Sequence, residues 1–224
     1  MIFHSTCYDD RQWWQENWEL SGDRLVAGVD EVGRGALFGP VVAAAVLAPI
    51  GTIEQLRALG VRDSKKLSSN RRWDLARELP EYLHRYAISF ADVPTIERIN
   101  IRQASLLAME RAVAKLPLAP DYLLVDGRDI LPRYAFPQMA ITAGDNHSVL
   151  IGAASILAKV WRDDLITRLA ARFPGYDLAQ NKGYGTVKHR QGLKTLGKTP
   201  LHRQLFCRKI VGDLNSFPPL LKGG

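Results

Sequence analysis

Two adjacent acidic residues, Asp30 and Glu31, stand at the end of an apolar run, Leu25 to Val29, that we expect to form a β-strand. Neighbouring carboxylates repel each other, so this position favours a bound cation that neutralises them. The next block is Gly33-Arg34-Gly35. Glycines let a ligand approach the backbone N–H groups, and an arginine can bind a phosphate. A cation site beside a ligand-binding turn is one interpretation, and an acidic surface turn is the other.

Two further aspartates follow predicted strands. The apolar run from Tyr122 to Val125 ends at Asp126, and open α/β sheets place their ligands at such strand ends. Another short strand, Met139 to Thr142, precedes Asp145, and we expect a helix from about Ser148 to Ala171. Read alone, Asp126 also suits a turn, and Asp145 also suits the N-cap or first turn of that helix.

The rest of the pattern predicts the elements that position these acids. A second apolar run, Val41 to Leu47, should pair with the first strand as a hairpin. We also expect a loop or short helix at 52–59, a helix over 71–83 capped by Ser68 or Ser69, a strand over 86–91, a helix from Pro94 to near Pro117, and small helices after Phe173. A hairpin followed by alternating strands and helices predicts an α/β protein, with a layered sheet flanked by helices.

Five ordered blocks of the sequence resemble type 2 ribonucleases H, and specifically the bacterial ribonuclease HII family. The first is Asp-Glu-Val-Gly-Arg-Gly at 30–35, followed by Gly-Pro-Val-Val at 39–42. The others are Asp-Ser-Lys-Lys-Leu-Ser at 63–68, Val-Asp-Gly at 125–127, Ala-Ala-Ser-Ile-Leu-Ala-Lys-Val at 153–160 and Lys-Gly-Tyr-Gly-Thr at 182–186. Ala36, Ala143 and Leu205 depart from the family's usual Pro, Lys and Ser. The related ribonuclease HIII signature fits less well, because it has Lys where Arg34 stands.

The resemblance implies a ribonuclease H-like mixed sheet flanked by helices, with a small C-terminal helical extension. It also implies a metal-dependent endonuclease. Phosphodiester hydrolysis needs an activated water and a stabilised leaving oxygen, and two Mn²⁺ or Mg²⁺ ions held by carboxylates can supply both. The family's four acidic positions match Asp30, Glu31, Asp126 and Asp145, which we therefore expect to be catalytic and to bind the metal ions.

The implied substrates are RNA–DNA hybrids, cleaved in the RNA strand, and duplex DNA with an embedded ribonucleotide. Cleavage 5′ of the ribonucleotide leaves a 3′-hydroxyl and a 5′-phosphate. The 2′-hydroxyl distinguishes RNA from DNA. By resemblance, Gly33, Arg34 and Gly35 approach that hydroxyl and Tyr184 packs on the following deoxyribose. Lys65 is expected to bind phosphate by the same resemblance, although read alone it is as well explained as an exposed lysine.

The positive charge is concentrated near the C-terminus. The net charge is +7, and the stretch 178–212 contains eight Lys and Arg but no Asp or Glu, so the rest of the chain holds 22 basic against 23 acidic residues. With Tyr184, His189, His202 and Phe206 interleaved, this stretch suits a track for a polyanion. The alternatives are a solvated basic face, a non-catalytic nucleic-acid-binding module, or a phosphatase that uses the carboxylates but not the track.

Length and composition predict one domain. We expect an N-terminal extension packed on the body (1–24), a catalytic core (25–173), a basic helical extension of the same domain (174–215) and a tail (216–224). The apolar runs are shorter than the ~20 residues that a membrane span needs. With only Cys7 and Cys207, no disulfide framework is expected, which favours the cytoplasm. We expect a monomer that binds nucleic acid and no membrane.

Overall fold

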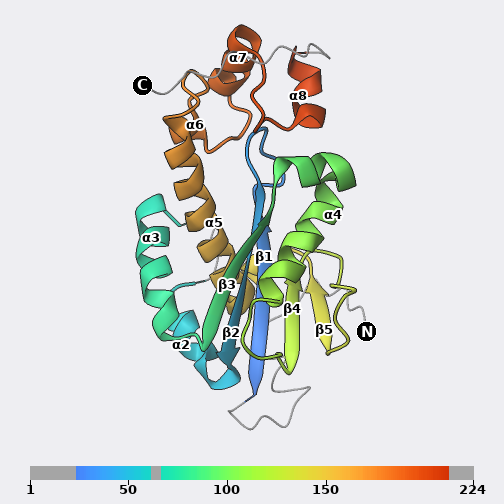
Figure 1. Cartoon of the computed structure of the whole chain (residues 1–224). Coiled ribbons are helices and arrows are strands. Elements are labelled where there is room, and N and C mark those ends of the chain that lie inside the picture. The colour runs from blue at the N-terminus through green and yellow to red at the C-terminus, as the bar shows by residue number, and fades with distance from the viewer. Residues whose placement is uncertain (1–23, 62–66, 212–224) are drawn as a thin grey trace. The chain divides into compact units, whose positions relative to one another are not determined.

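The computed structural model describes residues 24–61 and 67–211, which fall into two compact units (Figure 1). The first unit contains the chain up to Val32, Val42–Phe90 and Ser105–Val160. The second contains Gly33–Val41, Ala91–Ala104 and the chain from Trp161 on. The predicted N-terminal extension as far as residue 23 and the predicted tail over 216–224 lie outside the described residues.

A five-stranded mixed sheet is the framework of the first unit. Its strands are β1 (Leu25–Val32), β2 (Val41–Pro49), β3 (Arg85–Ala91), β4 (Tyr122–Asp126) and β5 (Gln138–Ile141), in the spatial order β3-β2-β1-β4-β5. β1 and β2 pair antiparallel, which confirms the predicted hairpin. β4 is parallel to both β1 and β5. The α/β fold class is confirmed.

The inner strands are buried on both faces, which explains their nearly continuous apolar sequences. Every residue of β2 from Val41 to Ala48 is buried, as are Val26 to Asp30 of β1. At Gly28 the strand approaches a helix so closely that a Cβ atom would lie 2.4 Å from the carbonyl carbon of Leu150. Glycine is required at this position because the helix backbone occupies the space of a side chain.

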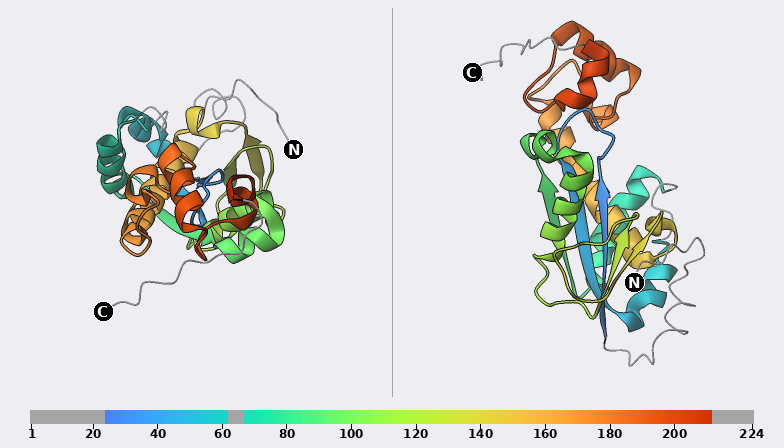
Figure 2. Two further views of the ribbon diagram at one scale, coloured as in Figure 1. Left: turned by 90° about the horizontal axis from the view of Figure 1, so that it is seen from above. Right: turned by 90° about the vertical axis from the view of Figure 1, so that its right-hand side faces the viewer.

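Helices flank the sheet and form most of the second unit. They are α2 (Ile53–Ala58), α3 (Ser69–Glu78), α4 (Val93–Val113), α5 (Val149–Ala170), α6 (Leu178–Asn181), α7 (Val187–Leu196) and α8 (Gln204–Val211), with 3₁₀ turns η1 (Ile50–Thr52), η2 (Leu79–Glu81) and η3 (Gly144–Asn146). Within the first unit, Figure 1 shows α4 from Ser105 on in front of the sheet and α5 up to Val160 behind it. Within the second unit, α7 and α8 lie next to each other (Figure 2).

Two predicted helices differ from their observed forms. Ser68 caps α3 by accepting a hydrogen bond from the Arg71 backbone N–H at 3.2 Å, as predicted. The α-helix ends at Glu78 and passes into the 3₁₀ turn η2, where Pro80 has no backbone N–H to continue the α-helical hydrogen bonds. α4 is interrupted at Asn100, which has φ 65° and accepts a hydrogen bond from the Gln103 N–H at 3.1 Å. Asn100 therefore caps the second half of α4.

Among the described residues, no helix is both long enough and apolar enough to cross a bilayer.

Substituting Gly28 by Ala should test the close packing of β1 on α5. The added methyl group would overlap the backbone at Leu150 and Ile151, so we expect the free energy of unfolding to fall by about 2 kcal/mol or more. Gly35→Ala is the matched control, because a Cβ atom there meets no atom within 4 Å. Urea unfolding checks both, and equal stability of the two variants would contradict the packing described.

Candidate active site

The structure brings three of the four predicted carboxylates together at one edge of the sheet. Val29 of β1 pairs with Val125 of the parallel strand β4, so the next residue of each strand is an aspartate. Oxygen atoms of Asp30, Glu31 and Asp126 lie within 4.8 Å of one another. Asp30 is buried, and the other two are half-buried. The strand register therefore produces an acidic cluster from residues almost a hundred positions apart in the chain.

The cluster concentrates negative charge in a poorly solvated place. Burial raises the pKa of Asp30 well above its usual value, and the charges of Asp126 and Glu31 raise it further. A hydrogen bond from Ser155 acts in the opposite direction. The Glu31 backbone N–H also donates to Asp30 Oδ1 at 2.6 Å, which holds the carboxyl in place.

Asp145 is not among the three residues whose carboxylate oxygens form this cluster. It is 2% exposed and belongs to η3, a turn that precedes α5. Its neighbour Gly144 donates its backbone N–H to Asp126 Oδ1 at 2.6 Å. Ser148 accepts a hydrogen bond from the Ile151 N–H at 3.4 Å at the start of α5. Asp145 is thus a first-turn acid of η3 rather than of α5, whose own first turn contains no acidic residue.

The donor atoms of the cluster suit a hard divalent cation. Mg²⁺ and Mn²⁺ prefer oxygen ligands, whereas zinc sites are usually built from His and Cys. The three cluster residues offer carboxylate oxygens alone. A bound cation would also relieve the repulsion that raises the pKa of Asp30. The residues present therefore fit a metal of this class.

The predicted glycine turn belongs to the second unit. Gly33 has φ 89°, and a Cβ atom there would lie 2.2 Å from Arg162 Nε, so its need for glycine is explained by packing. Gly35 is exposed and open to solvent, as a ligand-approach site requires. Arg203 donates to the carbonyl oxygen of Arg34 at 2.8 Å and so holds the turn from within, while the Arg34 residue itself is exposed.

Tyr184, also in the second unit, is half-buried, and the Arg162 guanidinium lies 5.4 Å from the centre of its ring. Lys65 falls between the described segments.

Two buried arginines, Arg162 and Arg203, are not predicted by the sequence as parts of the site. Both are fully buried and donate to backbone carbonyls, Arg162 to Phe38, Pro40 and Lys182 and Arg203 to Gly39 and Arg34. No local pattern distinguishes them from surface arginines.

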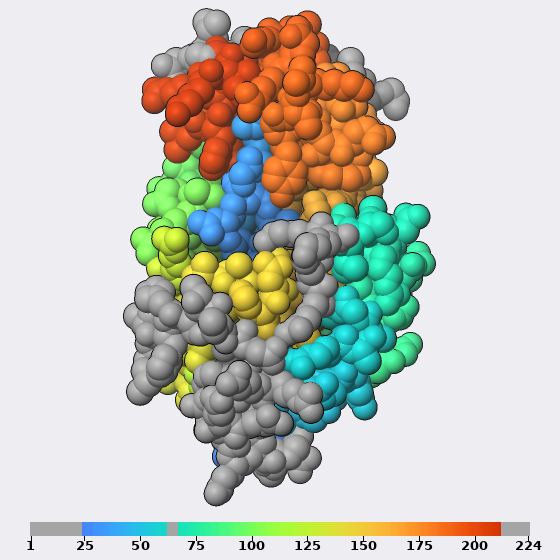
Figure 3. Space-filling view, turned by 180° about the vertical axis from the view of Figure 1, so that it is seen from behind, coloured from blue at the N-terminus to red at the C-terminus, as the bar shows by residue number. Residues whose placement is uncertain are grey.

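The predicted basic track is partly wrong. Four residues of this stretch are buried in the second unit rather than exposed: Lys198, Arg203, His189 and His202. The basic residues that remain exposed are Lys188, Arg190, Lys194, Arg208 and Lys209. Figure 3 shows the surface formed by this part of the chain in orange and red.

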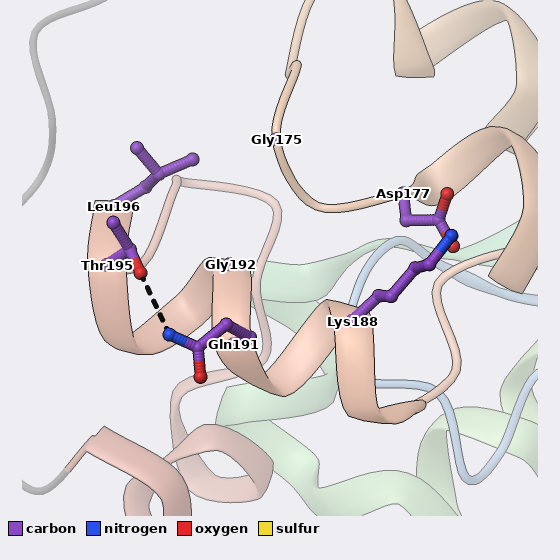
Figure 4. Close-up of a pocket in the computed structure, with 7 residues that line it drawn as sticks. All are labelled: Gly175, Asp177, Lys188, Gln191, Gly192, Thr195 and Leu196. Carbon is purple, nitrogen blue, oxygen red and sulfur yellow. Dashed lines mark hydrogen bonds between the residues drawn. The ribbon is translucent and has the colours of Figure 1, made fainter.

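A hollow of about 620 Å³ lies over α7 (Figure 4). Its wall includes Lys188, Asp177 and Gln191, and Gln191 donates to Thr195 at 3.3 Å. It contains a single carboxylate and so lacks the chemistry of the acidic cluster.

Comparison with known proteins identifies the family. The family model described as Ribonuclease HII matches residues 27–209. A curated ribonuclease HII from Synechocystis is 74% identical over 83% of this chain and 98% of its own length, and one from Acaryochloris marina is 57% identical over 81% and 92%. The chain belongs to the ribonuclease HII family. As a member of that family, it is a metal-dependent ribonuclease, and the acidic cluster is compatible with that chemistry.

Solved structures agree with the family assignment. The ribonuclease H2 of Pyrococcus horikoshii is 28% identical, with a TM-score of 0.71 over 84% of this chain and 97% of that one. The Aquifex aeolicus RNase H3 structure is 19% identical, with a TM-score of 0.60 over 88% and 78%, and shows the fold alone. The ribonuclease H-like fold class is therefore confirmed.

Replacing Asp30 with Asn should stabilise the metal-free protein. Because the pKa of Asp30 is raised on folding, its ionisation at neutral pH lowers the free energy of unfolding. This loss shrinks as pH falls through the folded-state pKa and is gone below the unfolded-state pKa of about 3.9. Asn removes the charge and keeps an oxygen for the Glu31 N–H. We expect a gain of about 1 kcal/mol or more in EDTA at pH 7.5, measured by urea unfolding. A gain that persists equally at pH 4 would contradict this explanation.

Proposed function

We propose that this ribonuclease cleaves the RNA strand of RNA–DNA hybrids and cuts duplex DNA on the 5′ side of a single embedded ribonucleotide. The products are a 3′-hydroxyl and a 5′-phosphate. The observation that carries the proposal is the cluster of Asp30, Glu31 and Asp126, whose oxygens lie within 4.8 Å of one another. Family membership supports it as well.

The proposed catalytic and metal-binding residues are Asp30, Glu31, Asp126 and Asp145. The proposed cofactor is Mn²⁺ or Mg²⁺. When bound, two such ions activate the attacking water and stabilise the leaving oxygen of the phosphodiester. The protein contributes fixed ligands. The Glu31 N–H orients Asp30, and the Gly144 N–H orients Asp126. The second of these bonds also ties Asp126 to the residue before Asp145, which supports the inclusion of Asp145.

We propose that two segments of the second unit select the substrate: Gly33, Arg34 and Gly35 approach the 2′-hydroxyl, and Tyr184 packs on the following deoxyribose. Lys65, which lies outside the described residues, is proposed to bind phosphate. The open space at Gly35 and the exposure of Arg34 support the first part. Tyr184 is half-buried with the Arg162 guanidinium beside its ring, so part of the residue stays accessible, which supports the second part.

The exposed basic residues of α7 and α8 are proposed to bind the phosphates of the duplex. Lys188, Arg190 and Lys194 lie on α7, and Arg208 and Lys209 lie on α8. Binding of this kind weakens steeply with salt because it releases counterions. We propose that the protein acts as a monomer in the cytoplasm.

Cleavage of a labelled duplex that carries one ribonucleotide tests the proposal. In Mg²⁺ or Mn²⁺ we expect a single cut 5′ of the ribonucleotide, and no cut in EDTA or in an all-DNA control duplex. Asp126→Asn should reduce the rate below detection while binding to the duplex in salt titrations is retained. Binding without cleavage by the wild type in either metal would favour the non-catalytic module instead.

A further inference from the structure

His189 and His202 form a buried pair in the core of the second unit. They are 0% and 1% exposed, and their Nε2 atoms lie 3.1 Å apart. The sequence predicts instead that these two histidines belong to an exposed basic track. Where two neutral imidazole nitrogens are in hydrogen-bond contact, one must carry a proton and the other must not. The other hydrogen bonds around the pair therefore determine which ring nitrogens are protonated.

One backbone group fixes the direction of the whole chain of hydrogen bonds. The Thr199 N–H lies 3.0 Å from His202 Nδ1, and a backbone N–H can only donate. Neutral His202 must therefore carry its proton on Nε2, which donates to His189 Nε2. Neutral His189 must in turn carry its proton on Nδ1, which donates to the Tyr184 carbonyl oxygen at 2.9 Å.

The surroundings of the pair keep it neutral. Burial lowers the pKa of His202 to about 3, with a further contribution from His189. Burial also lowers the pKa of His189, while the hydrogen bond to the Tyr184 carbonyl and the charge of Asp177 act in the opposite direction. The rings of Tyr176 and Phe38 that pack on His202 carry no charge, and the neighbouring Arg203 donates to Gly39 and Arg34 carbonyls.

The end of this chain of hydrogen bonds is the backbone of Tyr184. The same carbonyl accepts from the Thr186 N–H at 2.9 Å, and the Tyr184 N–H donates to Asn181 at 2.9 Å. Thr186 caps α7 through the His189 N–H at 3.3 Å. His189 thus fixes the peptide of Tyr184 relative to the helix on which the imidazole itself stands.

We propose that His189, oriented by His202, is a positioning residue that sets Tyr184 for recognition of the sugar after the ribonucleotide. This inference rests on the proposed role of Tyr184. Removing the donor to the Tyr184 carbonyl should weaken selection of the ribonucleotide–DNA junction more than cleavage of a continuous hybrid, where no deoxyribose follows the cut.

Two amide substitutions separate the two bonds of His189. His189→Asn places an amide N–H near the position of Nδ1, so it keeps a donor for the Tyr184 carbonyl and loses contact with His202. His189→Gln reaches the position of Nε2, so it keeps the contact with His202 and loses that donor. Each is compared with Tyr184→Ala, by kcat/KM on a single-ribonucleotide duplex divided by kcat/KM on a continuous hybrid.

We expect Gln to lower this ratio about three- to tenfold, as loss of one hydrogen bond would, and Asn to keep it within about twofold of the wild type. Equal loss in Asn and Gln, or no loss in Gln while Tyr184→Ala lowers the ratio, would overturn the positioning role and leave the role of Tyr184 intact. An unchanged ratio in Tyr184→Ala would overturn the role of Tyr184, and the inference with it.

A second measurement does not depend on the folding of variants. ¹⁵N NMR of the wild-type histidine side chains should show protonated Nδ1 in His189 and protonated Nε2 in His202, unchanged from pH 8 to pH 6. The reverse tautomers, or titration of either ring in this range, would overturn the proposed chain of donors.

Discussion

Repulsion among three carboxylates is the constraint on which the site of this ribonuclease depends. Asp30, Glu31 and Asp126 would be more stable apart, and burial of Asp30 increases the cost. Parallel pairing of β1 with β4 nevertheless holds them together, and the Glu31 and Gly144 N–H groups fix two of them. The repulsion lowers the stability of the metal-free fold, and a bound divalent cation would relieve it, so the relief of repulsion favours metal binding.

The elements that carry this cluster were largely predictable from sequence. Apolar runs marked β1, β2 and β4, and the acids stood at their ends, so the hairpin and the strand carrying Asp126 followed from local pattern. Resemblance to the family was needed to connect these acids with one another, because no local signal reveals a parallel pairing across almost a hundred residues. The kink at Asn100 and the separate turn of Asp145 depend on single backbone conformations that periodicity does not reveal.

The second unit shows where sequence reasoning fails. Four residues of types that are typical of a protein surface are buried in this unit: Arg162, Arg203, His189 and His202. Most of their hydrogen bonds are made with backbone carbonyls and ring nitrogens, although Arg203 Nη2 is buried without a partner among the described residues. Such partners cannot be recognised from residue type. Arg203 contacts the carbonyl of Arg34 and His189 contacts the carbonyl of Tyr184, in the two segments to which substrate recognition is assigned. Polar residues taken from the expected phosphate track thus support the positions that are proposed to contact substrate.

Calorimetric titration of Mn²⁺ into the metal-free protein at pH 7.5, without nucleic acid, tests most directly whether the carboxylate cluster is the metal site. We expect the wild type to bind Mn²⁺ and Asp126→Asn to bind it at least about tenfold more weakly. Asp164→Asn, which alters an acid paired with Arg168 outside the cluster, should bind like the wild type. Equal Mn²⁺ affinity in the wild type and Asp126→Asn would contradict the assignment of the carboxylate cluster as the metal site.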